Sequence, residues 1–220
     1  MSPAFDPQLA QRIESCGIIA VLVVDRAEDA VPLARALLAG GVNAMELTLR
    51  TPAALDALKA IRAGVPDMLA GVGTILTTGQ VKQVVEANAA FGVSPGVNPR
   101  VLAAAREAGL SFAPGVVTPS DIEVSLEHGC RLLKFFPAEP SGGLAYLKAM
   151  AAPYAHLGVK FVPLGGLNAK NMATYLADAH VAALGGSWLA PRDLIRAGEW
   201  DKITALAAEA VQIIKSTRKQ

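Results

Sequence analysis

The chain has 220 residues, of which 52% are hydrophobic and only 5% aromatic, and its formal net charge is +1. A nucleic-acid-binding protein usually has a clustered basic face, and the one basic run here is the tail at residues 215–219, so nucleic acid is not an expected partner. The longest apolar run, residues 18–24, is too short to span a bilayer, and residues 1–17 lack the apolar core of a secretory signal. Cys16 and Cys130 have neither metal-site nor disulfide spacing, so we expect a soluble, cytoplasmic protein with free thiols.

Apolar runs and helical stretches alternate along the chain after a short leading helix, which we expect at residues 6–16. Eight apolar runs have the length and composition of buried strands, and they cover residues 18–24, 42–49, 68–72, 90–93, 110–113, 132–137, 159–164 and 181–184. Helical stretches follow the first six runs at residues 27–39, 52–63, 79–88, 99–108, 119–128 and 144–151. The seventh run is followed by a helix that Asn168 is expected to cap, and the eighth by the final helices, the last of which covers residues 200–215.

Eight strand–helix units with short connections allow either a closed barrel or an open, doubly wound sheet. Eight units in 220 residues favour the closed barrel, and the first strand is not followed by the Gly-x-Gly-x-x-Gly of a dinucleotide-binding sheet. We therefore predict an α/β fold, namely a single (β/α)8 TIM barrel over residues 1–220 with a short N-terminal helix.

Lys134 lies in the middle of a short apolar and aromatic strand that ends at Pro137. Burial of an unpaired ammonium is costly unless the group loses its proton. A lysine with a depressed pKa is a nucleophile towards carbonyl groups near neutral pH. Because side chains alternate along a strand, Phe136 shares the face of Lys134 and would line the same pocket. The alternative is a lysine at a strand end that extends its head group to solvent.

Glu46, Thr48 and Arg50 alternate with apolar residues, so the three polar side chains share one face of a strand and are expected to point into the barrel. If Lys134 also points inwards, it can meet Glu46 across the barrel. A carboxylate beside an amine can act as a general acid and base, and the planar guanidinium of Arg50 matches a substrate carboxylate. The alternative is a structural Glu46–Arg50 ion pair at the barrel rim.

Other candidate residues follow the expected ends of other strands. Thr74 offers a hydroxyl to the pocket, although it would equally suit the cap of the next helix. Pro95 is expected in a rigid turn that could also shape the pocket wall. Glycine pairs at residues 165–166 and 185–186 follow strands seven and eight, where barrels bind phosphate through backbone amides and a helix N-terminus. Tight turns are the alternative reason for these glycines.

Two segments resemble the signatures of the class I 2-keto-3-deoxy-6-phosphogluconate (KDPG) aldolases, a family that includes 4-hydroxy-2-oxoglutarate aldolases. One is Gly-Val-Asn-Ala-Met-Glu-Leu-Thr-Leu-Arg at residues 41–50, and the other is Gly-Cys-Arg-Leu-Leu-Lys-Phe-Phe-Pro-Ala at residues 129–138. The resemblance extends from residue 18 to the C-terminus. Three shorter segments resemble family segments in the same order, at residues 71–74, 94–96 and 185–188.

The resemblance implies a homotrimer of barrels that works without a metal or organic cofactor on a small keto-acid phosphate. It implies cleavage of KDPG to pyruvate and D-glyceraldehyde 3-phosphate, in which Lys134 forms an imine with the substrate and Glu46 moves protons. Arg50 and Thr74 would hold the pyruvate part of the substrate, beside a wall shaped by Pro95. The phosphate would be bound by four residues at the glycine-rich strand ends: Gly165, Gly166, Gly186 and Ser187.

Two positions depart from the family pattern. Leu164 stands where a threonine is expected before the glycine pair, and residues 19–21 lack a proline that is common there. The missing threonine hydroxyl leaves two other substrates open for the same chemistry, 2-keto-3-deoxy-6-phosphogalactonate and unphosphorylated 4-hydroxy-2-oxoglutarate. Two other classes are an isomerase or epimerase, in which Glu46 is the base and no covalent adduct forms, and a catalytically silent sugar-phosphate-binding protein.

Overall fold

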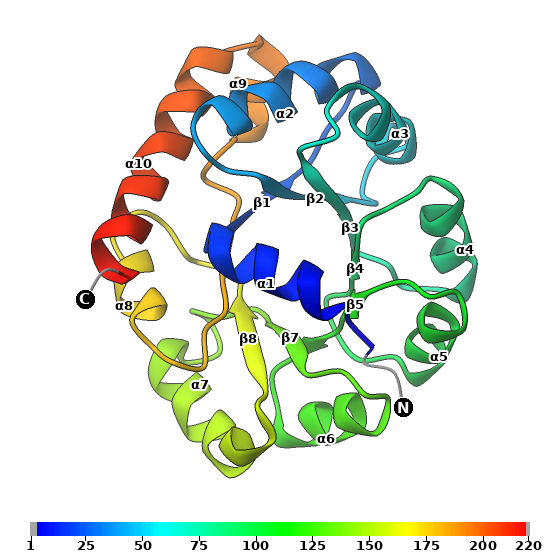
Figure 1. The fold of residues 1–220 in the computed structure, drawn as a ribbon, viewed down its shortest axis with the longest axis vertical. Helices are drawn as coiled ribbons and strands as arrows, with labels where there is room; N and C mark the ends of the chain where they lie inside the picture. The colour runs from blue at the N-terminus through cyan, green and yellow to red at the C-terminus, as the bar shows by residue number, and fades with distance from the viewer. Residues whose placement is uncertain (1–3, 219–220) are drawn as a thin grey trace.

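A computed structural model describes residues 4–218, which form a ring of strands surrounded by helices (Figure 1). All strand pairs are parallel. The strands are β1 (Ile18–Leu22), β2 (Ala44–Thr48), β3 (Leu69–Gly73), β4 (Gly92–Val93), β5 (Phe112–Ala113), β6 (Gly115–Val116), β7 (Leu132–Phe135), β8 (Lys160–Pro163) and β9 (Leu184–Gly186).

The helices alternate with the strands, and the predicted leading helix is confirmed as α1, capped by Asp6. The helices are α1 (Pro7–Cys16), η1 (Ala27–Asp29), α2 (Ala30–Ala39), α3 (Ala54–Gly64), α4 (Thr78–Glu86), α5 (Pro99–Glu107), α6 (Pro119–Glu127), α7 (Gly143–Ala151), η2 (Ala152–Leu157), α8 (Met172–Leu176), α9 (Arg192–Ala197) and α10 (Trp200–Arg218). The predicted N-cap at Asn168 is wrong. Its side chain accepts a hydrogen bond from the Lys170 amide at 2.9 Å, which forms a separate turn before α8 begins.

The strands hydrogen-bond as two sheets, one of six strands in the order β5-β4-β3-β2-β1-β9 and one of three in the order β6-β7-β8. The fifth predicted strand, at residues 110–113, is β5, and Pro114 separates it from a further short strand, β6, because proline has no N–H with which to continue a ladder. A lone bridge between Phe161 and Val181 joins β8 to the segment that leads to β9. The predicted α/β, TIM-barrel-like fold is confirmed, but the predicted closure of the barrel is not, because the strands form two separate hydrogen-bonded sheets.

Alternation along the strands divides the core into two parts. Met45 and Leu47 of β2 point outwards into the larger cluster, which the helices cover. Inward-facing residues such as Phe91 form a smaller cluster inside the ring, together with Phe5 and Ile13. Because α1 leads directly into β1 and lies across the ring in Figure 1, it closes the end at which the strands begin. The opposite end, where the strands finish, is left for the functional site.

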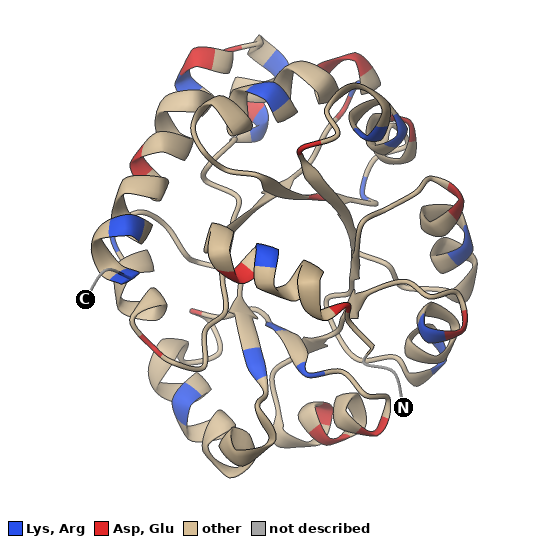
Figure 2. Cartoon of the chain, in the orientation of Figure 1, with Lys and Arg blue, Asp and Glu red and all other residues tan. Residues whose placement is uncertain are grey.

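The outer surface is polar and its charges are mixed. Figure 2 shows lysine and arginine interspersed with aspartate and glutamate over the outer helices. Over residues 4–218, no helix has both the length and the apolar character needed to cross a bilayer. Cys16, which is half-buried, and Cys130, which is buried, are both free thiols.

Candidate active site

Lys134 and Glu46 meet inside the ring, as the alternation along their strands predicts. The Lys134 Nζ atom lies 3.3 Å from the Glu46 Oε1 atom, and the two side chains are 8% and 3% exposed. Leu132 and Lys134 face the interior of the ring, whereas Leu133 and Phe135 belong to the outer cluster. The alternative of a lysine that extends its head group to solvent is therefore wrong.

Two neighbours define the space around this ion pair. A Cβ atom at Gly73 would lie 1.7 Å from the Glu46 Oε1 atom, so only glycine on β3 leaves room for the carboxylate. The Phe136 ring centroid lies 5.3 Å from the Lys134 Nζ atom, within the range of a cation–π contact. Gly73 is a residue that reasoning from sequence missed as part of the site. Its signal was the pair of glycines in Gly-Val-Gly at the end of the third strand.

Arg50 is held by Thr48 and not by Glu46. The Thr48 hydroxyl donates to the Leu22 carbonyl of β1 at 3.0 Å and accepts from the Arg50 Nε atom at 3.1 Å. Across the described part of the chain, the Arg50 side chain forms no ion pair, so its two terminal amino groups can bind an anion. The alternative of a Glu46–Arg50 ion pair is wrong, because the Glu46 carboxylate is paired with Lys134.

Thr74 has a strained backbone at the end of β3. Its φ angle is 63°, in the left-handed region, which costs a β-branched residue about 1 kcal/mol or more. The alternative role as a helix cap is wrong, because Thr77 caps α4 in a reciprocal capping box with Gln80. A Cβ atom at Gly115 would lie 2.2 Å from the Pro95 carbonyl oxygen, so this glycine allows Pro95 to pack closely.

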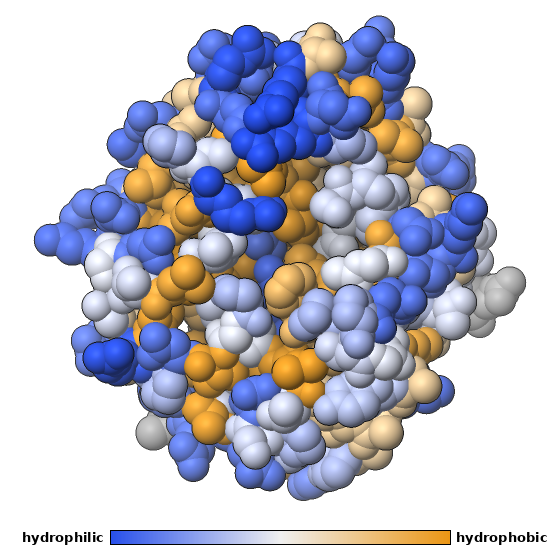
Figure 3. All heavy atoms as spheres, turned by 180° about the vertical axis from the view of Figure 1, so that it is seen from behind, coloured by the Kyte–Doolittle hydropathy of each residue, from blue (hydrophilic) through white to orange (hydrophobic). Residues whose placement is uncertain are grey.

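These side chains line one cavity of about 320 Å³ at the end of the ring where the strands finish. Figure 3 shows this end of the molecule, with hydrophobic side chains gathered towards its centre and hydrophilic ones at its rim. Among residues 4–218, no cluster of three or more His, Cys, Asp or Glu side chains could hold a metal ion. Of the ten residues to which the sequence assigned a role in the site, eight line this cavity: Glu46, Arg50, Thr74, Pro95, Lys134, Phe136, Gly165 and Ser187.

The glycine-rich strand ends differ in part from expectation. The amides of Gly165, Gly166 and Ser187 form no backbone hydrogen bond within residues 4–218, and of these three residues Gly165 and Ser187 line the cavity. No helix begins directly after either glycine pair, because α8 begins at Met172 and α9 at Arg192. The expected helix N-terminus at an anion site is therefore absent from residues 4–218.

Gly166 and Gly186 do not line the cavity itself, and Leu164 does. The Leu164 side chain lies over Gly185, where a Cβ atom would come within 2.1 Å of its Cγ atom. Gly186 lies against the Trp188 ring, where a Cβ atom would be 2.8 Å from the nearest carbon. The position that departs from the family pattern thus places an apolar side chain in the cavity wall.

A buried amine, a carboxylate within proton-transfer distance and an arginine that can bind an anion are the groups required for imine chemistry on a keto acid. The amine can attack a carbonyl carbon, and the carboxylate can accept and return protons. The guanidinium can bind the substrate carboxylate in a bidentate manner.

Comparison with known proteins points the same way. Residues 9–206 match the family model described as KDPG and KHG aldolase. The chain is 46% identical over 204 residues to a 2-dehydro-3-deoxy-phosphogluconate aldolase of Treponema pallidum, covering 93% of this chain and 96% of that protein. It is 45% identical over 195 residues to a KHG/KDPG aldolase of Escherichia coli, with 89% and 91% covered.

A solved structure is similar over most of its length. The crystal structure of KDPG aldolase from Legionella pneumophila, with pyruvate captured at low pH as a covalent carbinolamine intermediate, superposes with a TM-score of 0.86. The two chains are 40% identical, and the match covers 90% of this chain and 96% of the Legionella chain. On its sequence, its fold and the geometry of its cavity, this chain belongs to the KDPG and KHG aldolase family.

Proposed function

We propose that this chain is a class I aldolase that cleaves KDPG to pyruvate and D-glyceraldehyde 3-phosphate through an imine on Lys134. The observation that carries the proposal is the buried pair of Lys134 and Glu46, with 3.3 Å between Nζ and Oε1, in the wall of a cavity that Arg50 also lines. The carbinolamine captured in the Legionella enzyme supports the same chemistry.

The first half of the reaction makes the covalent intermediate. Glu46 takes a proton from the Lys134 ammonium across their 3.3 Å contact, and the neutral amine attacks carbon 2 of the keto acid. A bond forms between Nζ and carbon 2, the former carbonyl oxygen gains a proton, and water leaves. Arg50 and Thr74 hold the substrate carboxylate during these steps. The resulting protonated imine attracts electrons from the adjacent carbon–carbon bond.

The second half breaks that bond. Glu46, through a water molecule, removes the proton from the 4-hydroxyl group, the bond between carbons 3 and 4 breaks, and its electron pair forms a neutral enamine on Lys134. The aldehyde product then departs. Protonation of the enamine at carbon 3 and hydrolysis of the imine release pyruvate and restore the amine. The covalent route replaces an unstable carbanion with a neutral enamine, so one difficult step becomes several easier ones.

The phosphate group of the substrate would lie at the glycine-rich strand ends. In this proposal it is bound by Gly165, Gly166, Gly186 and Ser187, and the placement is supported by the amides of Gly165 and Ser187, which line the cavity and form no backbone hydrogen bond within residues 4–218. Pro95 and Phe136 would form the apolar wall. Leu164 supplies no hydroxyl here, which favours 4-hydroxy-2-oxoglutarate as a second substrate, in keeping with the double name of the Escherichia coli relative. The ratio of kcat/KM for KDPG to kcat/KM for 4-hydroxy-2-oxoglutarate shows which of these two substrates the enzyme prefers.

We also propose that the enzyme is a homotrimer in the cytoplasm. Leu76 and Tyr146 are large apolar side chains that are 50% and 36% exposed, and contacts between subunits commonly cover such side chains. Two free thiols are compatible with a reducing compartment.

A coupled assay of pyruvate release tests the proposed function. Purified protein is mixed with KDPG, lactate dehydrogenase and NADH, and the oxidation of NADH is followed. The wild type should release pyruvate, and Lys134→Met should release none. Lys82→Met is the matched control, because the Lys82 side chain is 81% exposed on α4. A folded wild type that releases no pyruvate would contradict the proposal, as would a Lys134→Met variant with normal turnover.

A further inference from the structure

The segment that follows β7, at residues 138–139, forms backbone hydrogen bonds with the segment that follows β8. β7 and β8 pair in register up to Phe135 and Pro163. Beyond that point the Ala138 amide donates to the Leu164 carbonyl at 2.6 Å, and the Glu139 amide donates to the Gly165 carbonyl at 2.9 Å. The backbone contact between the two segments therefore continues past the ends of the strands to the start of the glycine pair.

A side-chain contact completes this connection. The Tyr175 hydroxyl, from α8, donates a short hydrogen bond to the Glu139 carboxylate. Tyr175 is only 2% exposed, whereas Glu139 belongs to the loop after β7. Burial, together with the hydrogen bond to Glu139, raises the pKa of Tyr175, so its hydroxyl remains a donor throughout the working range of pH. The pair links helix α8 to the loop that follows the Lys134 strand.

The absence of a side chain at Gly166 leaves room for the Glu139 side chain. A Cβ atom at Gly166 would lie 2.5 Å from the Glu139 Cβ atom and 2.7 Å from its Cγ atom. On the other side, a Cβ atom at Gly143 would lie 3.2 Å from the Glu139 Oε1 atom and 3.4 Å from the Tyr175 hydroxyl. The side chain of Glu139 thus passes between two glycines to reach Tyr175. Gly166 therefore packs against Glu139, whereas Gly165 lines the cavity.

The turn at the glycine pair needs such support. Gly165 and Gly166 have φ angles of 97° and 85°, and glycine without neighbouring contacts visits positive and negative φ equally readily. Amides that bind an anion must be held in place before the anion arrives, because otherwise ordering the turn reduces the affinity.

We infer that Glu139 and Tyr175 are positioning residues that hold the Gly165–Gly166 turn in the shape that receives the phosphate group of the substrate and that tie this turn to the Lys134 strand. The inference rests on the proposed function, because it assigns specificity for a phosphomonoester to two residues that need not contact the phosphate or the reacting atoms. Glu139 and Tyr175 are expected to affect binding at the phosphate end of the substrate and to leave imine formation at the other end unchanged.

The test is the variant Tyr175→Phe, which removes the hydroxyl and keeps the ring that packs in the core. Loss of a hydrogen bond to a charged group corresponds to a change of about tenfold. We expect KM for KDPG to rise by about that factor, with kcat retained, and kcat/KM for unphosphorylated 4-hydroxy-2-oxoglutarate to stay within about twofold of the wild type. Borohydride trapping of pyruvate on Lys134 should be unchanged.

The matched control is Tyr154→Phe. Tyr154 also donates to a glutamate, Glu123, at 3.0 Å, and neither residue lines the cavity. This control should leave both substrates unaffected. Glu139→Gln is a second variant that keeps the length of the side chain and one acceptor oxygen, so it should raise KM for KDPG less than Tyr175→Phe does.

The outcomes separate this inference from the proposed function. If the wild type cleaves both substrates and Tyr175→Phe and Glu139→Gln lower kcat/KM equally on both, or change neither, the inference is overturned and the proposed function stands. If the wild type cleaves neither substrate, the proposed function fails and the inference fails with it. A Tyr175→Phe protein that does not fold leaves Glu139→Gln to decide by the same selectivity.

Discussion

The position of the Glu46 carboxylate depends on a residue that has no side chain. On the neighbouring strand, Gly73 leaves the space that the Glu46 Oε1 atom occupies, and Lys134 attracts the carboxylate from across the ring. Thr48 holds Arg50 away from this pair, through a hydrogen bond of 3.1 Å. The acid–base pair and the anion-binding arginine can therefore act on different parts of one substrate.

Replacing Glu46 with glutamine tests the role of the carboxylate. The amide keeps the size of the side chain but cannot accept a proton, so we expect kcat to fall by about a hundredfold or more. Steady-state release of pyruvate measures the effect. Turnover near the wild-type value would remove Glu46 from the proton-transfer role.

Replacing Gly73 with alanine tests the space around the same carboxylate. A Cβ atom would lie 1.7 Å from the Glu46 Oε1 atom and force the carboxylate away from Lys134, so we expect a loss of activity of about a hundredfold, similar to that of Glu46→Gln. Gly79→Ala, on α4, is the control, because the atom nearest to the added Cβ would be 3.9 Å away. Equal activities of the two alanine variants would show that this space is not required.

At this scale the sequence is a good guide to the polar residues and a poor guide to the glycines. The alternation around Glu46 and the burial of Lys134 follow from period-two patterning, which depends only on neighbours in the chain. The role of Gly73 depends on which residue faces it on the next strand. The sequence does not state that register, so Gly73 was missed.

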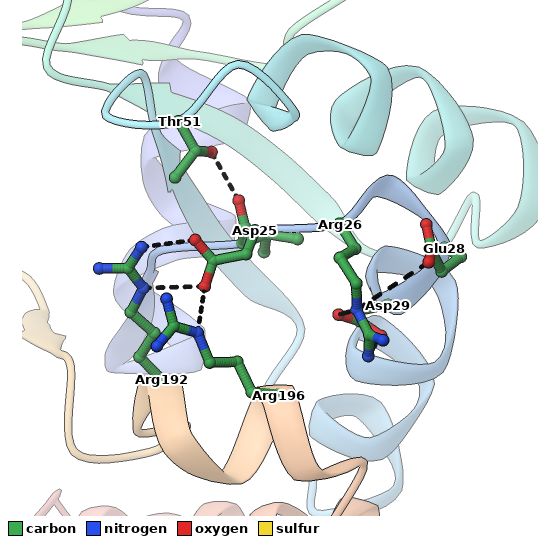
Figure 4. A network of polar contacts seen from close by, with 8 residues as sticks. Asp25, Arg26, Glu28, Asp29, Thr51, Arg192 and Arg196 are labelled. Atoms are coloured by element: carbon green, nitrogen blue, oxygen red, sulfur yellow. Dashed lines mark hydrogen bonds and ion pairs between the residues drawn. The ribbon is translucent and has the colours of Figure 1, made fainter.

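At the scale of elements, the segment after β1 is clamped to α9. Figure 4 shows the Asp25 carboxylate accepting hydrogen bonds from Arg192 and Arg196, which lie one turn apart on α9. The Arg192 Nε atom is 2.9 Å and the Arg196 Nε atom 2.7 Å from the Asp25 Oδ2 atom. The Thr51 hydroxyl also donates a hydrogen bond to the Val24 carbonyl at 2.5 Å. Together these contacts connect three segments, namely the residues after β1, the residues after β2 and helix α9.

The clamp predicts a pH-dependent contribution to stability. The hydrogen bonds from Arg192 and Arg196 hold the pKa of Asp25 well below its ordinary value of 3.8. As the pH falls, Asp25 is protonated in the unfolded chain at a higher pH than in the folded chain. The contribution of the clamp to the free energy of unfolding is therefore complete above about pH 5 and declines as the pH falls towards the folded pKa.

Urea denaturation of the wild type and Asp25→Asn at pH 7 and pH 3 measures this contribution. We expect the wild type to be the more stable at pH 7 and the difference between the two proteins to shrink at pH 3. Asp67→Asn is the control, because Asp67 is exposed and forms no ion pair within residues 4–218. A difference between wild type and Asp25→Asn that grows on acidification would contradict this account.

The elements themselves were largely predictable, because buried parallel strands read as short apolar runs and the helices have recognisable caps. Two features were not. The short strand β6, which follows Pro114 and pairs with β7, has no counterpart among the eight expected strands, because two residues are too few to form a recognisable apolar run. Asn168 has the side chain of a helix cap but forms an isolated turn, and nothing in its local sequence distinguishes these two uses of asparagine.

At the scale of the whole molecule, the proposed trimer has a direct test. The chain mass is 22.7 kDa, so multi-angle light scattering should give about 68 kDa, three times that value. Leu76 is the most exposed of the large apolar side chains of the described region, and Leu76→Asp should weaken the assembly if subunits cover it. A wild-type mass of about 23 kDa would contradict the trimer.

The barrel-like arrangement explains why groups far apart in the chain act together. Lys134 and Glu46 are separated by 88 positions in the sequence and yet form a buried ion pair, because parallel strands present their ends at the same side of the ring. Helix α1 lies across the other side of the ring, and Ile13 of this helix packs into the inner cluster.

Borohydride reduction in the presence of saturating pyruvate tests the central claim, imine formation on Lys134, most directly. Intact-mass and peptide mass spectrometry locate the adduct, with a reaction without pyruvate as the control. The account predicts a single pyruvate-derived adduct on Lys134 and a nearly complete loss of activity. An unmodified Lys134, or an adduct that persists on another residue in Lys134→Met, would contradict it and favour an isomerase or a binding protein.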